Sequence, residues 1–289
     1  MSRSKKGKKR GFFGKLLIFL CVAAAFGLLW FGAEFVAGLV GNRLSGTQGE
    51  TGQGSGLMNT VYENLPKNSY DLSLFTRKDG FVHYTGAQTA HTGVDVSSHQ
   101  GTIDWAAAAA DGVEYAMIRV GYRGYTNGTI TMDELFRQNV ESARANGIEV
   151  GAYFFSQAIT TDEAAEEAKA AVTALKGLDI TYPVIFDWEH VEGGARTDGL
   201  DTTTLTDCAK TFCQAVEAAG YTAGVYFNQA FGYQELQLPE LQDDVFWLAQ
   251  YASAPDFYYD FQMWQYTNSG KVNGIEGDVD LNLSFWQKK

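Results

Sequence analysis

One stretch of the sequence decides the fold: Pro183-Val184-Ile185-Phe186-Asp187-Trp188-Glu189-His190. Its apolar first half has the length of a β-strand and is typical of a strand buried on both faces in a helix-covered parallel sheet. Because side chains alternate along a strand, Asp187 and Glu189 project to the same face at its C-terminal end. An α/β barrel keeps its catalytic groups at this end, and neighbouring acids can differ enough in pKa for one to stay protonated. The alternative is a surface Asp and Glu that cap a helix or pair with a lysine.

Outward from this stretch, strand and helix patterns alternate from His91 to the C-terminus. Strands are predicted at 92–96, 115–121, 150–156, 183–188, 223–227, 245–251, 261–266 and 279–283, and helices at 105–110, 133–146, 161–176 and 203–219. Gly147, Gly177 and Gly220 stand where helix C-caps are expected. Repeated strand–helix units imply a parallel sheet, and eight strands favour a closed barrel. The short segments between the last strands predict that the barrel is irregular at its end.

Charge is distributed unevenly along the chain, whose net charge is −12. Residues 1–15 hold seven of the 22 Lys/Arg and no acid, whereas residues 41–289 hold 33 of the 34 Asp/Glu. Because residues 41–289 are so acidic, this part of the chain is a poor candidate for binding the phosphates of nucleic acid. The three cysteines make no disulfide framework, and we expect Cys208 and Cys213 to be small core residues. The four histidines form no metal motif, so we expect no metal and no cofactor.

The first 90 residues are interpreted as three segments that precede the barrel. Residues 1–15 form a basic flank, and residues 16–40 are apolar except for Glu34, long enough for one transmembrane helix. The positive flank predicts a single-pass membrane protein with a cytoplasmic N-terminus and an extracellular C-terminal domain. A cleaved signal peptide is the alternative, since residues 23–25 are three alanines. Residues 41–90 are expected to form a Gly-rich linker and a stalk that could lie against the domain.

Two further acids are expected to join Asp187 and Glu189. Asp95 stands at the end of the first predicted strand, and Asp280 stands at the start of the last one. Because strand ends converge in a barrel, these four acids can cluster. Aromatic residues on neighbouring strands would wall the cluster: Tyr153, Tyr226, Trp247, Tyr251, Trp264 and Tyr266. Rings stack on sugars and acids act on the glycosidic oxygen, so this composition indicates carbohydrate chemistry.

Six motifs in order carry a resemblance to a known family: Gly93-Val94-Asp95-Val96-Ser97-Ser98-His99-Gln100-Gly101 with Ile103-Asp104-Trp105, Gly151-Ala152-Tyr153-Phe154-Phe155-Ser156, Asp187-Trp188-Glu189, Trp247-Leu248-Ala249-Gln250-Tyr251, Trp264-Gln265-Tyr266 and Val279-Asp280-Leu281-Asn282. From about His91 to Lys289 the chain resembles the family 25 glycoside hydrolases, the Chalaropsis-type lysozymes. The resemblance implies an irregular TIM-like (β/α) barrel over residues 91–289, with five βα units and a final run of three strands. It also implies that Glu189 is the catalytic acid and that Asp95, Asp187 and Asp280 complete the acidic cluster. Relatives often carry a histidine where this chain has Phe154, which leaves the contact at that position open.

The resemblance implies an N-acetylmuramidase that binds the glycan strands of peptidoglycan and cleaves the β-1,4 bond between N-acetylmuramic acid and N-acetylglucosamine. Two other functions stay open, a wall-binding module with lost catalysis and a metal-dependent phosphodiesterase or deacetylase. The Asp-x-Glu spacing favours attack by the substrate's own acetamide, with Asp187 orienting the amide. Glu189 would protonate the leaving oxygen and then activate water. The alternative is direct attack by water, with Asp187 or Asp95 as the base.

Overall fold

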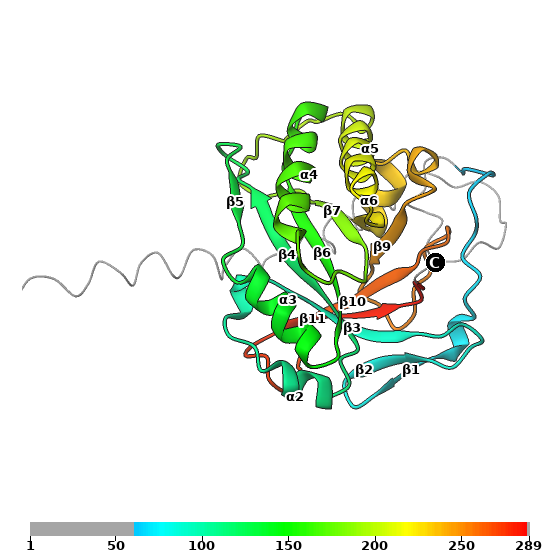
Figure 1. Cartoon of the computed structure of the whole chain (residues 1–289). Helices are drawn as coiled ribbons and strands as arrows, with labels where there is room; N and C mark the ends of the chain where they lie inside the picture. The colour runs from blue at the N-terminus through cyan, green and yellow to red at the C-terminus, as the bar shows by residue number, and fades with distance from the viewer. Residues whose placement is uncertain (1–60, 288–289) are drawn as a thin grey trace, which may run out of the picture. The chain divides into compact units, whose positions relative to one another are not determined.

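The computed structural model describes residues 61–287 (Figure 1). The predicted basic flank, the transmembrane segment and the first part of the linker lie outside the described residues, so these remain predictions. Within 61–287, every helix is too short or too polar to cross a bilayer.

Eight strands close a barrel in the order β3 (His91–Val96), β4 (Tyr115–Arg123), β6 (Glu149–Ser156), β7 (Val184–Trp188), β8 (Ala223–Asn228), β9 (Val245–Ala249), β10 (Met263–Gly270) and β11 (Val279–Ser284). Pairing is parallel from β3 through β10. The last strand, β11, is antiparallel to both β10 and β3 and closes the barrel between them. The predicted α/β barrel with an irregular end is confirmed.

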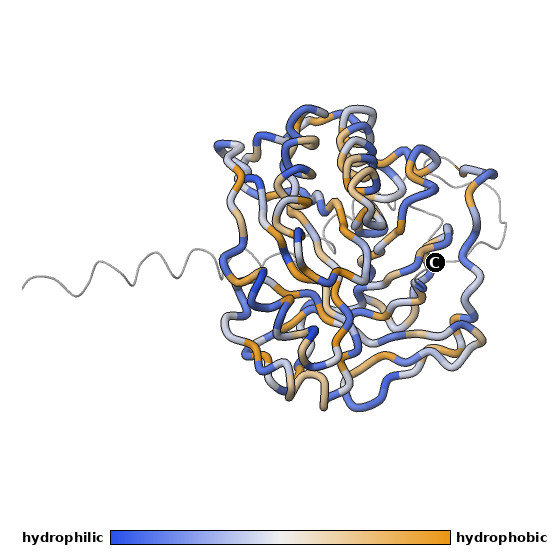
Figure 2. Tube along the Cα trace, viewed as in Figure 1, coloured by the Kyte–Doolittle hydropathy of each residue, from blue (hydrophilic) through white to orange (hydrophobic). Residues whose placement is uncertain are grey.

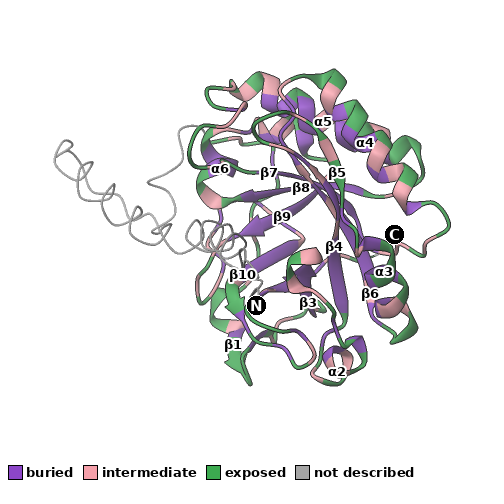
Figure 3. Cartoon of the chain, turned by 90° about the vertical axis from the view of Figure 1, so that its left-hand side faces the viewer, coloured by how far each residue is buried: buried purple, intermediate pink, exposed green. Residues whose placement is uncertain are grey.

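Five helices follow the first five barrel strands: α2 (Trp105–Ala110), α3 (Phe136–Ala145), α4 (Thr161–Leu175), α5 (Thr202–Ala218) and α6 (Gln229–Gln234). The four predicted helices are present to within three residues at each end, while α6 was not predicted. Helices α4 and α5 lie side by side over the barrel (Figures 1 and 3). Gly147, Gly177 and Gly220 follow their helices with φ of 79°, 76° and 90°, the conformation that a C-cap glycine supplies.

Short elements complete the described chain. Strand β5 (Ile130–Met132) pairs antiparallel with the end of β4. The 3₁₀ turns are η2 (Leu72–Leu74), η3 (Ser98–Gln100) and η4 (Leu238–Leu241).

Side chains of the barrel strands alternate between an inner and an outer core. Tyr115, Met117, Ile185 and Trp247 fill the barrel interior. The intervening residues, such as Phe186, pack outward under the helices. Figure 2 shows hydrophobic residues gathered along the strands, and Figure 3 shows the barrel strands largely buried and the helices exposed on their outer side. The strand Val184–Trp188 is buried at every position, as its apolar sequence predicts.

Residues 61–90 pack against the barrel. Strands β1 (Phe75–Lys78) and β2 (Phe81–Tyr84) form a hairpin whose turn residues Asp79 and Gly80 both have positive φ, the conformation of a type I′ turn. The Tyr70 ring stacks on Phe285 with centroids 4.1 Å apart. The packed unit therefore starts well before His91, where the sequence placed the beginning of the domain.

Candidate active site

The four predicted acids come from three strands at one end of the barrel. Asp95 on β3 and Asp280 on β11 are register partners across the antiparallel ladder. Asp187 lies near the C-terminal end of β7, and Glu189 follows one residue after that strand ends. The exposed fraction is 7% for Asp95 and 6% for Asp187, whereas Glu189 is exposed to solvent. The structure thus brings together acids that are up to 185 positions apart, because the strand ends converge.

Two side-chain amides hold the Asp95 carboxylate. Gln265 Nε2 and Asn282 Nδ2 both donate to Asp95 Oδ2, at 2.9 and 2.7 Å. Both amides are buried on the inward faces of β10 and β11. Two donors on one oxygen favour the charged form of the carboxyl, so Asp95 is the acid of this cluster best suited to carry a negative charge.

Aromatic donors fix the orientation of these amides. The hydroxyls of Tyr226 and Tyr251 donate to Gln265 Oε1 at 3.0 and 2.9 Å. Trp247 Nε1 donates to Asn282 Oδ1 at 2.9 Å. Because each amide oxygen is already occupied by a donor, each NH₂ group must face Asp95. These three rings therefore orient the acidic cluster, a role that the sequence analysis did not assign to them.

Burial and mutual repulsion raise the pKa values of the acids. Desolvation and the nearby Asp95 charge raise the pKa of Asp280 to about 9, and Asp280 keeps a proton that it shares with Asp95. The same two causes raise the pKa of Glu189 to about 7. Solvent reaches the Glu189 side chain at the end of the barrel, but the surrounding protein still desolvates its carboxyl. Near neutral pH, Glu189 therefore exists in both protonation states, as a general acid that later acts as a base requires.

Asp187 is buried with one oxygen unpaired. Its Oδ1 has no hydrogen-bond partner within the described chain. Desolvation, followed by the charges of Glu189 and Asp95, raises the pKa of Asp187 well above its ordinary value, while Arg119 opposes the shift. A buried polar atom without a partner is costly, and such atoms concentrate where a ligand completes the site. Asp187 is thus placed to bind a donor group of a substrate.

The structure divides the predicted aromatic wall into two groups. Tyr153 lies edge-on to Trp247 with centroids 6.2 Å apart, inside the barrel. Trp264 and Tyr266 instead lie on the outward face of β10, on either side of the inward Gln265, and are fully buried. Assigning those two rings to the substrate site was wrong, since alternation along the strand points them away from the acids.

The outward rings of β10 belong to the contact with the β1–β2 hairpin. Trp264 packs edge-on against Phe75 at 5.4 Å, and the backbone N–H of Val82 donates to the Tyr266 hydroxyl. On β6, Phe154 likewise faces outward and packs with Phe212 of α5. The departure from the family pattern at residue 154 therefore lies under a helix and not beside the acids.

Three site residues were missed by sequence reasoning. Gln265 and Asn282 both occur inside quoted motifs. Asn282 stands two residues after Asp280, so strand alternation was the available signal for it, whereas Gln265 stands between the predicted rings Trp264 and Tyr266. Arg119, on β4, pairs with Asp133 at 2.9 Å and donates to Ser98 Oγ at 3.3 Å. Nothing in its local sequence distinguishes Arg119 from a surface arginine, because its partners come from two separate loops.

Comparisons with known proteins agree with this architecture. The family model described as glycosyl hydrolases family 25 matches residues 94–275. Lysozyme M1 of Streptomyces globisporus is 29% identical over 205 residues, which cover 66% of this chain and 66% of that protein. The autolytic lysozyme of Clostridium acetobutylicum is 26% identical over 191 residues, covering 66% of this chain and 54% of that protein. The chain thus spans between about half and two thirds of the length of these relatives.

Solved structures show the same fold. The modular autolysin LytC from Streptococcus pneumoniae, solved in complex with a synthetic peptidoglycan ligand, has a TM-score of 0.61 and 26% identity, covering 72% of this chain and 51% of that one. A family 25 glycosyl hydrolase from Bacillus anthracis has a TM-score of 0.52 and 21% identity, covering 71% of this chain and 93% of that one. Because the family model matches more than half of the sequence, the chain belongs to glycosyl hydrolases family 25.

Proposed function

We propose that the barrel is an N-acetylmuramidase that cleaves the β-1,4 bond between N-acetylmuramic acid and N-acetylglucosamine in peptidoglycan. The observation that carries the proposal is the inward cluster of Asp95, Asp187, Glu189 and Asp280, in which Glu189 has a pKa of about 7. The substrate is inferred from relatives that are named lysozymes and from a similar autolysin solved with a peptidoglycan ligand.

In the proposed mechanism, the substrate's 2-acetamido group is the nucleophile. Protonated Glu189 donates its proton to the glycosidic oxygen, while the acetamide oxygen attacks the anomeric carbon. The unpaired Oδ1 of Asp187 accepts the acetamide N–H. This donor and the cationic ring that forms favour the charged form of the buried carboxyl, and the Asp187 charge in turn stabilises the ring. The Glu189 carboxylate then takes a proton from the water that opens this ring, which returns Glu189 to its starting state. Two successive inversions retain the anomeric configuration.

Purified cell walls test the activity directly. The full chain should clear a wall suspension, and mass spectrometry should find N-acetylmuramic acid at the new reducing ends. N-acetylglucosamine at those ends would contradict the assigned bond. Binding to walls without release of fragments would identify a wall-binding module instead. Loss of activity in excess EDTA would favour the metal-dependent alternative.

We also propose that the enzyme is tethered to the cell membrane by residues 16–40, with residues 1–15 in the cytoplasm and the barrel outside. The support is the basic flank before a long apolar run. Protease added to intact protoplasts should release the barrel. If the basic flank is digested while the barrel is protected, the orientation is reversed, and a free secreted barrel would point to a cleaved signal peptide.

A further inference from the structure

The main chain at Glu189 is bound by a buried amide from the neighbouring strand. Gln157 Nε2 donates to the Glu189 carbonyl oxygen at 2.9 Å. The last registered pair between β6 and β7 is Ser156 with Trp188, so Gln157 and Glu189 stand one step beyond the end of the ladder. The Gln157 side chain therefore supplies a hydrogen bond to Glu189 where the regular sheet pairing has stopped.

The Gln157 amide is itself held in one orientation. Its side chain is fully buried, and Thr197 Oγ1 donates to its Oε1 at 3.0 Å. Thr197 is only 2% exposed. Since the amide oxygen accepts from Thr197, the NH₂ group has to face the Glu189 carbonyl. A buried amide with both ends satisfied resists rotation, because turning it would leave two buried polar groups unpaired.

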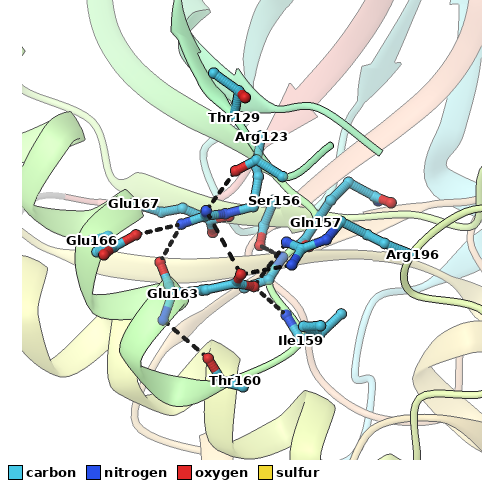
Figure 4. Close-up of polar contacts among 12 residues, drawn as sticks. Arg123, Thr129, Ser156, Gln157, Ile159, Thr160, Glu163, Glu166, Glu167 and Arg196 are labelled. Carbon is cyan, nitrogen blue, oxygen red and sulfur yellow. Dashed lines mark hydrogen bonds and ion pairs between the residues drawn. The ribbon is translucent and has the colours of Figure 1, made fainter. Parts of the chain in front are cut away.

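Ion pairs support the backbone of Gln157. Arg196 Nη1 donates to the Gln157 carbonyl at 3.1 Å, and Arg196 also binds both oxygens of Glu163, at 2.8 and 2.6 Å. Glu163 in turn accepts from the backbone N–H of Ile159. Figure 4 shows Arg196 between Gln157 and Glu163. Bidentate arginine–carboxylate pairs fix geometry as well as charge, so the loop that carries Gln157 is rigidly placed.

A second arginine ties this loop to the rest of the barrel end. Arg123, at the end of β4, donates to Glu167 Oε1 at 2.6 Å and to the Glu163 carbonyl at 2.9 Å (Figure 4). It also donates to the Gly128 carbonyl at 2.7 Å. The Arg123 side chain is 4% exposed and that of Glu167 is fully buried. A Cβ atom at Gly128 would lie 2.8 Å from Arg196 Cζ, so the backbone at Gly128 lies directly against the Arg196 guanidinium.

We infer that Gln157, oriented by Thr197 and supported by the Arg196–Glu163 pair, is a positioning residue that sets the place of the Glu189 carboxyl for proton transfer. This inference deepens the proposed function and rests on it. Glu189 lies outside regular secondary structure, and proton transfer requires a heavy-atom separation of about 2.6–3.2 Å. A residue that acts through the acid in this way affects turnover more than substrate binding.

The test compares Gln157→Met with Asn139→Leu in the full chain. Asn139 of α3 is a matched control, a buried side-chain amide whose Oδ1 accepts a hydrogen bond from Trp105 Nε1 of α2. Gln157→Met should lower kcat on soluble peptidoglycan oligosaccharides by about 10- to 100-fold with KM changed little, since a small misplacement of a catalytic group has that effect. Asn139→Leu should lower Tm without this loss of kcat. If both variants lose kcat to the same extent, in proportion to their loss of Tm, the inference is overturned.

Two further variants separate positioning from folding. Thr197→Val removes the hydroxyl that orients Gln157 and should lower kcat, whereas Thr197→Ser keeps the hydroxyl and should restore most of it. Carbon-13 NMR of the Glu189 carboxyl, assigned with Glu189→Gln, should show its pKa falling from about 7 in Gln157→Met, because a freed carboxyl turns towards water. An unchanged pKa would contradict the inference. This readout needs no substrate, so a wild-type chain without muramidase activity would refute the proposed function alone.

Discussion

At the residue scale, the site separates the tasks of its four acids by their hydrogen-bond partners. Asp95 receives two amide donors, Asp280 keeps the shared proton, and Asp187 has an oxygen without a partner. Glu189 remains as the group that titrates near neutrality. Identical chemical groups therefore acquire different roles from their surroundings, which is how acid and base functions are assigned in paired carboxylates.

Glu189→Gln should keep the fold and lower turnover by about 10²- to 10⁴-fold, the usual contribution of a general acid. The measurement is the rate of release of reducing ends from purified walls, with thermal unfolding to establish that the variant is folded. The matched control is Glu192→Gln, an exposed acid in the following loop. Turnover close to wild type in the Glu189 variant would exclude this carboxyl from the mechanism.

Asp95→Asn should move the basic limb of the pH–rate profile. Desolvation, followed by the Asp95 charge, raises the pKa of Glu189 to about 7. Glu189 is therefore protonated below about pH 7, and this protonated form disappears as the pH rises. Removing the Asp95 charge lowers that pKa, and kcat should begin to fall at a lower pH than in the wild type. The profile of kcat against pH measures this shift. If the basic limb of the profile does not shift, a group other than Glu189 controls the fall of kcat at high pH.

Asp187→Asn should lower turnover strongly while Glu189 still acts as an acid, because the acetamide N–H loses a charged acceptor. Proton NMR of the first product from the wild type tests the same step, and it should show the retained anomer. If the inverted anomer forms first, water attacks directly and Asp187 or Asp95 acts as the base.

The Tm of Asp187→Asn tests the effect of the buried acid on stability. Because the pKa of Asp187 is raised in the folded state, replacing this acid should stabilise the fold increasingly as the pH rises above its unfolded-state pKa.

At the element scale, the β1–β2 hairpin is part of the barrel's packing. Phe75 contacts Trp264 and Phe285, and Arg77 lies over the Tyr266 ring at 5.3 Å. Upstream, the backbone of Asn68 bonds Tyr258, and its side chain bonds the carbonyls of Pro255 and Phe257. The segment 61–90 thus covers the outward face of β10 and fastens the loop that follows β9.

Phe75→Ala should lower the free energy of unfolding by about 3–5 kcal/mol, the usual cost of removing a buried phenylalanine ring. Its exposed neighbour Thr76 provides the control, since Thr76→Ala removes no buried contact. Denaturant unfolding measures both. Equal effects of the two substitutions would show that the hairpin does not stabilise the barrel.

At the scale of the whole molecule, the antiparallel closure by β11 creates the site. It places Asp280 and Asn282 beside Asp95, although these residues stand near opposite ends of the described chain. Among residues 61–287, no long helix follows β9 or β10, and the segment 61–90 packs on the outward face of β10.

A fragment of residues 91–289 should therefore be less stable than a fragment of residues 61–289. Removing the hairpin exposes Trp264 and Tyr266, which are fully buried in the intact unit, and apolar exposure costs about 25 cal/mol per Å². Thermal unfolding of the two fragments makes the comparison, and the shorter one should also bind more of a hydrophobic dye. Equal Tm values would show that residues 61–90 do not stabilise the barrel and form only a stalk.

The sequence by itself determined the barrel, its strands and the four acids, because strand alternation and the convergence of strand ends are local rules with a global consequence. Tertiary structure decided which side chains of β10 face the acids: Gln265 binds Asp95, while Trp264 and Tyr266 on either side of it pack outward against the docked hairpin. It also decided the partners of Gln265, Asn282 and Gln157, whose hydrogen bonds join residues 32 to 187 positions apart. Contacts of that range leave no periodic trace in a sequence, since they depend on how the strands close and not on the spacing of residues.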